Sequence, residues 1–239
     1  MCLDPHAEKY YSISPYAYCA GNPVNFIDPD GQDITISYVD KDKKEQTWVF
    51  NGNNGKDAPD NAFVQSFVSG YNYNLENGGG ENMKEAATNS DLNIPLQQGD
   101  ETQFVYNKKE GTYHIEWNPT DAIKTDEGYT MSPATNVDHE FDHAISYIDN
   151  PNAYIIRAKT PDKQYDNKEE RRVETGSEAR TARANYEFPE GYVRTNHSGG
   201  SWVTVPNSTS NGDRTTGVYR WINRHAKQTG NNTIYKRTK

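Results

Sequence analysis

PATNVDHEFDHAISYI, residues 133–148, is the stretch that carries the most information in this 239-residue chain. Apolar side chains recur in it at every third or fourth position, which predicts an amphipathic α-helix over these residues. Thr135 or Asn136 is the expected N-cap, because both side chains can accept a hydrogen bond from a backbone N–H of the first turn. The apolar positions are Val137, Phe141, Ile145 and Ile148.

The middle of this helix, His139-Glu140-Phe141-Asp142-His143, fits the pattern H-E-x-x-H. Positions i and i+4 lie on one face of a helix, so the two imidazoles can bind one Zn²⁺ ion from adjacent turns. Glu140 lies about 100° further around the helix. There its carboxylate can take a proton from water that the metal activates and then protonate the leaving amine. His139 and His143 are therefore the predicted zinc ligands, and Glu140 is the predicted catalytic residue.

A zinc site of this type needs a third protein ligand, which zincins take from a downstream His or Glu. No His follows at the spacing H-E-x-x-H-x-x-G-x-x-H, which excludes the metzincin form. A Glu-rich segment does follow, at a distance that suits a gluzincin. Glu170 is the first choice for the third ligand, with Glu169 and Glu178 as alternatives. The glutamates that do not bind the metal are expected to orient the histidines.

The segments before this helix predict an α+β fold with a small antiparallel sheet. Alternating apolar residues in 34–50 and in 103–117 predict two β-hairpins. Residues 60–70 place apolar side chains at helical spacing and predict a short helix. The Gly- and Asn-rich residues 77–101 are expected to form a loop.

The segments after the helix are more polar. Charged residues 166–187 are expected to form one or two solvent-facing helices, interrupted at Thr175-Gly176-Ser177. From residue 198 onward the chain is rich in Gly, Ser, Thr and Asn, which predicts a solvated tail. Its last part, 214–239, has seven Lys or Arg residues and no acidic residue.

Two further functions are expected around a zincin site. An edge strand near the active-site helix can pair with an extended peptide, and the strand predicted at 113–117 either has this role or belongs only to its hairpin. His114 in that strand is expected to lie on the strand face and not to bind metal. A donor that stabilises the oxyanion is also expected, and Tyr192, Arg194 and His197 are candidates because they follow the Glu-rich segment.

The composition excludes several classes of protein. The chain has 34 Asp and Glu against 25 Lys and Arg, a formal net charge of -9, and a mean hydropathy of -1.05. Phosphate repels a negative chain, so nucleic-acid binding is disfavoured. No run of about 18 apolar residues is present, so no membrane span is expected. Cys2 and Cys19 predict no disulfide framework and no cysteine zinc site, and the first residues lack the pattern of a signal peptide.

The N-terminal segment carries a separate pattern. Residues 4–31 contain an Asn-Pro step and end in Asp-Pro-Asp-Gly. This phrase resembles the end of the core of Rhs/YD-repeat proteins, in which a β-cocoon shell encloses a variable C-terminal toxin that begins just after the mark. The resemblance implies that 1–31 end such a core and that 32–213 form the toxin domain, followed by the basic tail 214–239.

The toxin region resembles a second family. The segments IEWNP at 115–119, HExxHA at 139–144 and EExR at 169–172 are together similar to the NleD-like zinc metallopeptidases, an effector family that also occurs as Rhs toxins. Carried over by position, the resemblance implies the same two histidine ligands and the same catalytic glutamate, and it puts the third ligand in the Glu169-Glu170 pair. The chain departs from the family at Asp142, where an apolar residue is usual.

The two resemblances together imply a zincin-like metallopeptidase that acts as a polymorphic toxin or effector on a protein in a target cell. A cognate immunity protein would block it, and an Rhs shell would accompany it in a full-length chain. Delivery as toxin cargo would account for the missing signal peptide, with the protein in the cytoplasm of the producing cell before delivery. Two alternatives are a metal-dependent nuclease toxin and a catalytically decayed, non-enzymatic Rhs fragment.

Overall fold

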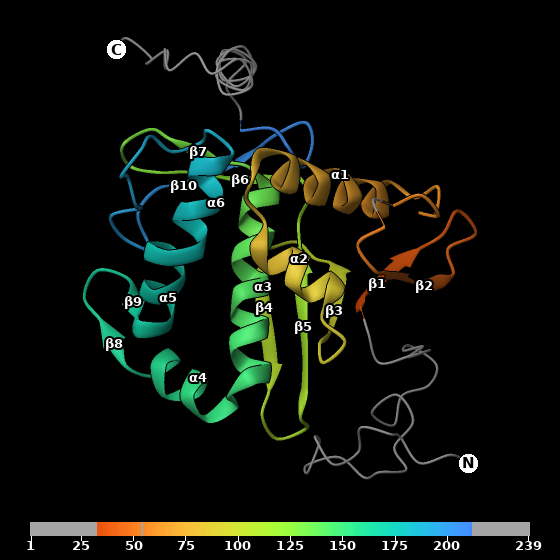
Figure 1. The fold of residues 1–239 in the computed structure, drawn as a ribbon, viewed down its shortest axis with the longest axis horizontal. Coiled ribbons are helices and arrows are strands. Elements are labelled where there is room, and N and C mark those ends of the chain that lie inside the picture. The colour runs from red at the N-terminus through yellow and green to blue at the C-terminus, as the bar shows by residue number, and fades with distance from the viewer. Residues whose placement is uncertain (1–32, 54, 212–239) are drawn as a thin grey trace.

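The structure, a computed structural model, describes residues 33–53 and 55–211, so the predicted core end at 1–31 and the basic tail at 214–239 lie outside the described residues. The fold is mixed α+β, as predicted (Figure 1). No helix within the described ranges is both long enough and apolar enough to cross a bilayer. The elements are, in chain order, β1 (Asp33–Val39), β2 (Glu45–Phe50), α1 (Ala62–Asn77), α2 (Glu81–Thr88), β3 (Asn93–Gln98), β4 (Gln103–Asn107), β5 (Thr112–Trp117), β6 (Asp121–Lys124), β7 (Thr130–Met131), α3 (Pro133–Asp149), α4 (Pro151–Ala158), β8 (Pro161–Asp162), β9 (Asp166–Asn167), α5 (Lys168–Val173), a π-helical turn (Glu174–Glu178), α6 (Ala179–Ala184) and β10 (Ser201–Thr204).

A five-stranded mixed sheet, with strand order β2-β1-β3-β5-β4, supports the fold. β1 pairs antiparallel with β2, and β4 with β5, so both predicted hairpins are confirmed. The central strands β1, β3 and β5 run parallel to each other. The prediction of an antiparallel sheet is therefore wrong. The antiparallel prediction takes only the two hairpins into account. β3 lies between the hairpins in the sheet and reaches its place by a crossover connection, which makes its pairings parallel.

This crossover accounts for residues 77–101, for which the prediction of a loop is wrong. Gly78 ends α1 with φ 87° and Gly80 precedes α2 with φ 72°, so glycines that suggest a loop here lie at helix ends. In β3, the fully buried Ile94 and Leu96 alternate with polar residues and a proline. The local strand signal is weak because burial between β1 and β5, and not intrinsic propensity, determines this strand.

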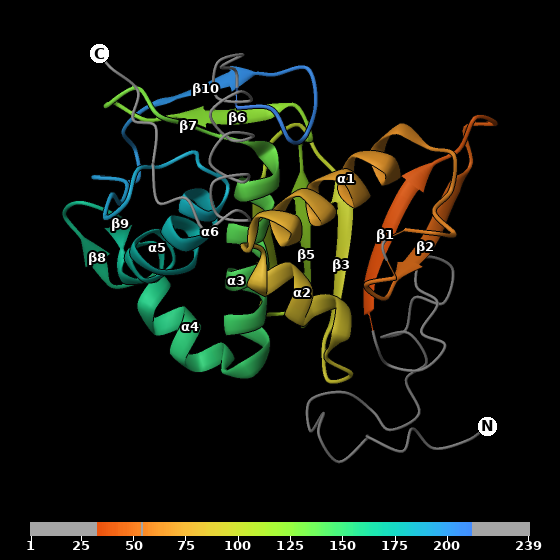
Figure 2. The same ribbon diagram turned by 45° about the horizontal axis from the view of Figure 1, so that its top comes forward.

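The core lies between this sheet and the helices α1, α2 and α3, which pack on it (Figure 2). Trp117 of β5 is fully buried, and its indole N–H donates to the Pro133 carbonyl at the start of α3 at 3.1 Å. Its ring contacts Phe63 and Phe67 of α1, the helix predicted at 60–70. These contacts fix the N-terminal end of α3 against the sheet.

Asp138 of α3 caps α2 from outside that helix. Its Oδ1 accepts the Met83 N–H at 3.0 Å, and its Oδ2 accepts the Thr181 hydroxyl at 2.8 Å. Gly80, the residue before α2, has no side chain that could cap the helix. Burial raises the pKa of Asp138 to about 6, although these hydrogen bonds oppose the shift. Asp138 therefore satisfies a first-turn donor that would otherwise be buried without an acceptor.

We expect Asp138→Ala to lower the free energy of unfolding by about 2 to 4 kcal/mol, because it leaves the buried Met83 N–H and Thr181 hydroxyl without their acceptor. Asp138→Asn keeps an oxygen for Met83 and should cost clearly less. Urea unfolding of both variants beside the wild type measures the two costs. Equal costs for the two substitutions would contradict the capping role.

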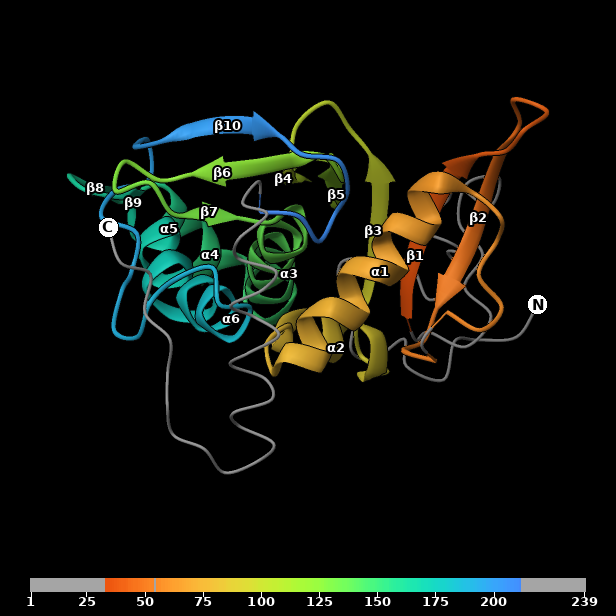
Figure 3. The same ribbon diagram turned by 90° about the horizontal axis from the view of Figure 1, so that it is seen from above.

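A second, three-stranded antiparallel sheet of order β10-β6-β7 lies beside the N-terminal end of α3 (Figure 3). β10 and the residues after it belong to the segment from 198 that we predicted to be a solvated tail. That prediction is wrong for 198–211. Val205 is buried, and the Ser208 carbonyl accepts the Ala134 N–H at 2.9 Å. The segment is held by backbone hydrogen bonds to β6 and to the start of α3. The polar composition of the segment does not reveal these bonds.

Candidate metal centre

The helix predicted at 133–148 is α3, and its first turn is fixed locally. Pro133 lies in the first turn, where a missing N–H leaves no gap in the helix hydrogen bonds. The Ser132 hydroxyl accepts the Thr135 N–H at 3.3 Å. The predicted helix is therefore confirmed, while Thr135 or Asn136 as the cap is wrong, because both residues already lie inside the helix.

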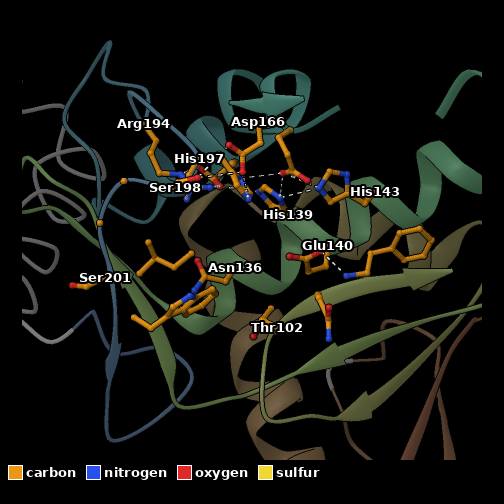
Figure 4. A pocket seen from close by; sticks show the side chains of 18 of the residues that line it. Thr102, Asn136, His139, Glu140, His143, Asp166, Arg194, His197, Ser198 and Ser201 are labelled. Carbon is orange, nitrogen blue, oxygen red and sulfur yellow. Dashed lines mark hydrogen bonds and ion pairs between the residues drawn. The ribbon is translucent and has the colours of Figure 1, made fainter. Parts of the chain in front are cut away.

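His139 and His143 lie on one face of α3, one turn apart, and line a cavity of about 510 Å³ (Figure 4). Their Nε2 atoms are 3.0 Å apart. Glu170, from the first turn of α5, brings its Oε2 to 3.3 Å from each of the two nitrogens. The structure therefore brings together the two predicted histidines and the first choice for the third ligand, which come from segments 27 residues apart.

Glu178 and Glu169, the two alternatives to Glu170, contact the opposite nitrogens of the imidazoles. Glu178 Oε2 lies 2.8 Å from Nδ1 of His139. Glu169 Oε1 lies 3.5 Å from Nδ1 of His143, at ion-pair distance. A carboxylate beside Nδ1 favours the tautomer that carries its proton there and leaves a lone pair on Nε2. With that tautomer, the two Nε2 atoms and Glu170 Oε2 can offer lone pairs to one cation, and the two other glutamates lie where histidine-orienting groups are needed.

Arginines hold these orienting carboxylates in place. Arg157 donates to Glu169, and Arg172 Nη2 donates to the same carboxylate at 2.6 Å. Arg194 Nη2 donates to Glu178 Oε2 at 2.8 Å. Since these carboxylates are buried, pairing with guanidinium groups offsets much of the cost of removing their charge from water.

The charged segment 166–187 is continuous and buried on one side. The prediction of solvent-facing helices is wrong, since Glu169, Glu174 and Glu178 are each exposed by 1% or less. The predicted interruption at Thr175-Gly176-Ser177 is confirmed, but as a π-helical turn that separates α5 from α6 and continues the chain between them in helical form. π-turns are frequent at functional sites. Here the turn keeps successive glutamates facing α3. The order of charged residues in the sequence does not reveal this orientation.

Asp142, the departure from the NleD-like pattern, does not line the cavity. Its Oδ1 pairs with Arg172 Nη1 at 2.6 Å, and its Oδ2 accepts the Ser177 hydroxyl. Asp142 therefore ties α3 to α5 and to the π-helical turn. Because Asp142 makes these contacts outside the cavity, it does not compete with the two histidines that line it.

When the two imidazoles are neutral, as metal binding requires, the carboxylates around them outnumber the cations that pair with them within the described part of the chain. Six carboxylates lie in or beside this cluster, and three arginines and His197 pair with them. A divalent cation between the ligand atoms would offset most of this excess. The carboxylates are Glu140, Asp142, Glu169, Glu170, Glu174 and Glu178, and the arginines are Arg157, Arg172 and Arg194.

The three ligand atoms fit Zn²⁺ in kind and in spacing. Zinc takes imidazole nitrogen and carboxylate oxygen at about 2.0 to 2.2 Å in a tetrahedral arrangement, which puts ligand atoms about 3.3 Å apart. The separations between His139 Nε2, His143 Nε2 and Glu170 Oε2 are 3.0, 3.3 and 3.3 Å. Three protein ligands leave a fourth position open, as in catalytic zinc sites.

In the metal-free protein the imidazoles attract protons. Burial lowers the pKa of His143, but the carboxylates of Glu170 and Glu169 outweigh it and raise the pKa to about 9. Burial is likewise outweighed at His139, where hydrogen bonds to Glu170 and Glu178 raise the pKa well above its usual value. Burial would raise the pKa of Glu170, but the charges of the two histidines hold it below its usual range.

Zinc binding at pH 7 is therefore expected to release at least about one proton per ion, because an imidazole must lose its proton before that nitrogen can bind. Both histidine pKa values are raised, so the zinc affinity should fall steadily as the pH is lowered from about 9. Calorimetric titration with zinc in two buffers of different ionisation enthalpy measures the protons released. Binding heats that are independent of the buffer would contradict this expectation.

Glu140 lies on the cavity side of α3 (Figure 4). Its Oε2 accepts the backbone N–H of Phe104 in β4 at 2.8 Å. Burial raises the pKa of Glu140, although the charges of His139 and His143 oppose the shift. A carboxylate with a raised pKa beside a metal site is suited to take up and return a proton.

The edge strand beside the cavity is β4, where Gln103 and Phe104 line the wall. β5 lies between β3 and β4, so of the two roles expected for the strand at 113–117, the hairpin strand is confirmed and the edge strand is not. The hairpin folds with its second strand inward because β3 pairs with β5. His114 lies on β5 beside Glu116, at 3.5 Å, in agreement with the prediction that it lies on a strand face, and it does not line the cavity.

The three candidates for an oxyanion donor occupy different surroundings. The Tyr192 hydroxyl donates to Glu127 at 2.5 Å, and Tyr192 does not line the cavity. Arg194 lines the cavity, but its guanidinium is buried against Glu178. His197 lines the cavity and is partly exposed. Of the three, His197 is the one with an accessible side chain beside the metal ligands.

Tyr154 of α4 is a cavity residue that the sequence patterns did not single out. The residue is 6% exposed, and its ring lies 6.1 Å from the His143 ring. Burial, together with the charges of Glu169 and Glu170, raises the pKa of its hydroxyl, which therefore remains a neutral donor. Asn150-Pro151, a cap followed by a helix-starting proline, is the local signal that could have indicated α4.

A scan against protein-family models and searches of curated proteins and of solved structures found no match for this chain.

Proposed function

We propose that this chain is a zinc-dependent metallopeptidase in which His139, His143 and Glu170 hold the metal. The observation that carries the proposal is the triangle of two Nε2 atoms and one Oε2, with sides of 3.0, 3.3 and 3.3 Å, beside the carboxylate of Glu140. When bound, Zn²⁺ would polarise the scissile carbonyl and lower the pKa of water.

Glu140 is the general base and then the general acid of the proposed reaction. It takes a proton from the attacking water and transfers it to the amide nitrogen of the leaving group, so the carboxylate is regenerated at the end of the cycle. The Phe104 N–H binds Oε2 and leaves Oε1 to exchange the proton. Burial, which raises the pKa of Glu140, favours transient protonation.

β4 is the edge strand of the five-stranded sheet, where an extended peptide substrate could pair with main-chain groups other than the Phe104 N–H, which Glu140 binds. A peptide can add to such an edge through main-chain hydrogen bonds. Gln103 and Phe104 of β4 share the cavity with the metal ligands, so a peptide paired there would pass Glu140. The Tyr154 hydroxyl and the His197 side chain are the groups on the wall suited to donate a hydrogen bond to the oxyanion.

Tyr154→Phe is expected to lower kcat by about 10- to 100-fold with the zinc content unchanged, because it removes a donor and keeps the ring. Tyr147→Phe is the matched control, since Tyr147 belongs to the same aromatic cluster and does not line the cavity. Steady-state hydrolysis of a peptide by the two variants makes the comparison. A Tyr154 variant as active as the Tyr147 variant would exclude Tyr154 as the oxyanion donor.

We further propose that the peptidase acts as a polymorphic toxin or effector on a protein inside a target cell. Support comes from the likeness of residues 4–31 to the end of an Rhs core and of 115–172 to NleD-like peptidases. The protein would be made in the cytoplasm, delivered as cargo with an Rhs shell, and blocked in the producing cell by a cognate immunity protein.

The test of the proposed reaction is digestion of an unfolded protein and of DNA by the zinc-loaded chain, before and after treatment with a chelator. Proteolysis that depends on zinc supports the proposal. DNA cleavage without proteolysis would instead support the nuclease alternative. A zinc-loaded chain that cleaves neither substrate would support the decayed fragment.

A further inference from the structure

Trp202 of β10 is an exposed indole on the wall of the catalytic cavity. Three large apolar side chains of the described residues are strongly exposed, Val39, Ile156 and Trp202, and of these only Trp202 lines the cavity. It is 55% exposed, although it shares that wall with the buried His139 and His143. Of the three exposed apolar side chains, Trp202 is therefore the one that belongs to the cavity.

The second sheet directs Trp202 toward the cavity. Trp202 pairs with Ile123 of β6, and Ile123 pairs with Met131 of β7, so the three side chains share one face of the sheet. Met131 is fully buried, and Ile123 packs on the same apolar cluster while it also lines the cavity. Trp202 lies on the edge strand, where this apolar face leaves the core and enters the cavity.

Trp202 has no partner of its own within residues 33–53 and 55–211. Its ring contacts no other aromatic ring, and its indole N–H has no acceptor there. The other aromatic side chains on the wall, Phe104 and Tyr154, pack against each other at 5.8 Å within the cluster beside α4. The indole of Trp202 is thus the aromatic surface of the cavity that is available to a ligand.

We propose that Trp202 and Ile123 form a substrate subsite for a large apolar side chain, aromatic or long aliphatic, of the bound peptide. This proposal rests on the proposed peptidase function and names its substrate class. A peptide along β4 presents successive side chains to opposite sides, and the cavity that β4 borders is also lined by residues 199–202, of which Figure 4 labels Ser201.

An apolar occupant gains from this wall, because it removes the indole and its own surface from water. A charged occupant would lose hydration there, since Ser201, Gly199 and Gly200, which line the cavity beside Trp202, carry no charge to pair with it. The subsite therefore discriminates by apolar area, and Trp202 supplies most of that area.

The test compares two peptide hydroxamates that differ only in Phe or Gly beside the zinc-chelating group. Their binding to the zinc-loaded full chain is measured by calorimetry. We expect the wild type to bind the Phe compound at least about tenfold more tightly. Trp202→Ala should reduce this preference to under about threefold, with the zinc content unchanged. Ile156→Ala, which removes an exposed apolar side chain outside the cavity, should leave the preference intact.

A preference that persists in Trp202→Ala, or its absence from the wild type, would overturn the subsite. Binding of a chelating probe needs no turnover, so the outcome does not depend on catalysis. A chain that shows the expected preference but hydrolyses no peptide would remove the proposed peptidase function and leave the subsite in place.

Discussion

Glu140→Gln is expected to lower kcat/KM for peptide hydrolysis by at least about 10³-fold, because the amide cannot take a proton from water. The zinc content should stay at the wild-type level. Glutamine has the shape of the native side chain and keeps an oxygen for the Phe104 N–H, and Glu140 is not one of the three ligand residues. The substitution therefore separates catalysis from metal binding.

Peptide hydrolysis and zinc content are measured on the same preparations of this variant. Glu116→Gln is the matched control, because Glu116 lies on β5 and does not line the cavity. It should leave both quantities within about threefold of wild type, as expected for a surface change. Hydrolysis by Glu140→Gln that approaches the rate of this control would exclude Glu140 as the general base.

His143→Ala is expected to weaken zinc binding by far more than about 100-fold, the upper range for loss of a group that only orients a ligand. It removes one corner of the ligand triangle and leaves Glu169 and Glu170 without the imidazole between them. Glu178→Gln should give the smaller loss, about 10- to 100-fold, since Glu178 contacts Nδ1 of His139 and not the metal position.

Competition with a zinc-binding dye measures these affinities. His114→Ala controls for the general effect of losing a histidine, because His114 is on β5 outside the cavity, and it should bind zinc as the wild type does. Equal affinities for His143→Ala and His114→Ala would mean that the metal binds elsewhere. Equal losses for His143→Ala and Glu178→Gln would remove the distinction between ligand and orienting group.

The sequence predicts α3 and the two histidines well because their information is local. Helical spacing places His139 and His143 on one face whatever surrounds them, and the apolar positions of the helix point to the core. The hairpins β1–β2 and β4–β5 are predicted for the same reason, since each pairing partner follows its neighbour directly along the chain.

The remaining parts of the site depend on contacts between distant segments. Three glutamates are candidates for the third ligand, and only the packing of α5 on α3 distinguishes Glu170 from Glu169 and Glu178. Charge alone predicts that such a helix faces water. Here arginines, among them the buried Arg194, pair with the carboxylates and offset the cost of burying them.

β3 and β10 escape prediction for a related reason. Each strand is held by its neighbours in the sheet and not by its own propensity. The exposed Trp202 and the buried Tyr154 reach the cavity through β10 and α4, so their roles become visible only with the fold.

The central claim is that His139, His143 and Glu170 hold one zinc ion. The most direct measurement is the X-ray absorption spectrum of the zinc-loaded wild-type chain, taken together with its metal content. We expect one zinc per chain, nitrogen and oxygen neighbours at about 2.0 to 2.2 Å, the scattering pattern of two imidazoles, and no sulfur. A chain that retains no zinc, or a spectrum with sulfur in the first shell, as Cys2 or Cys19 would give, would contradict the claim.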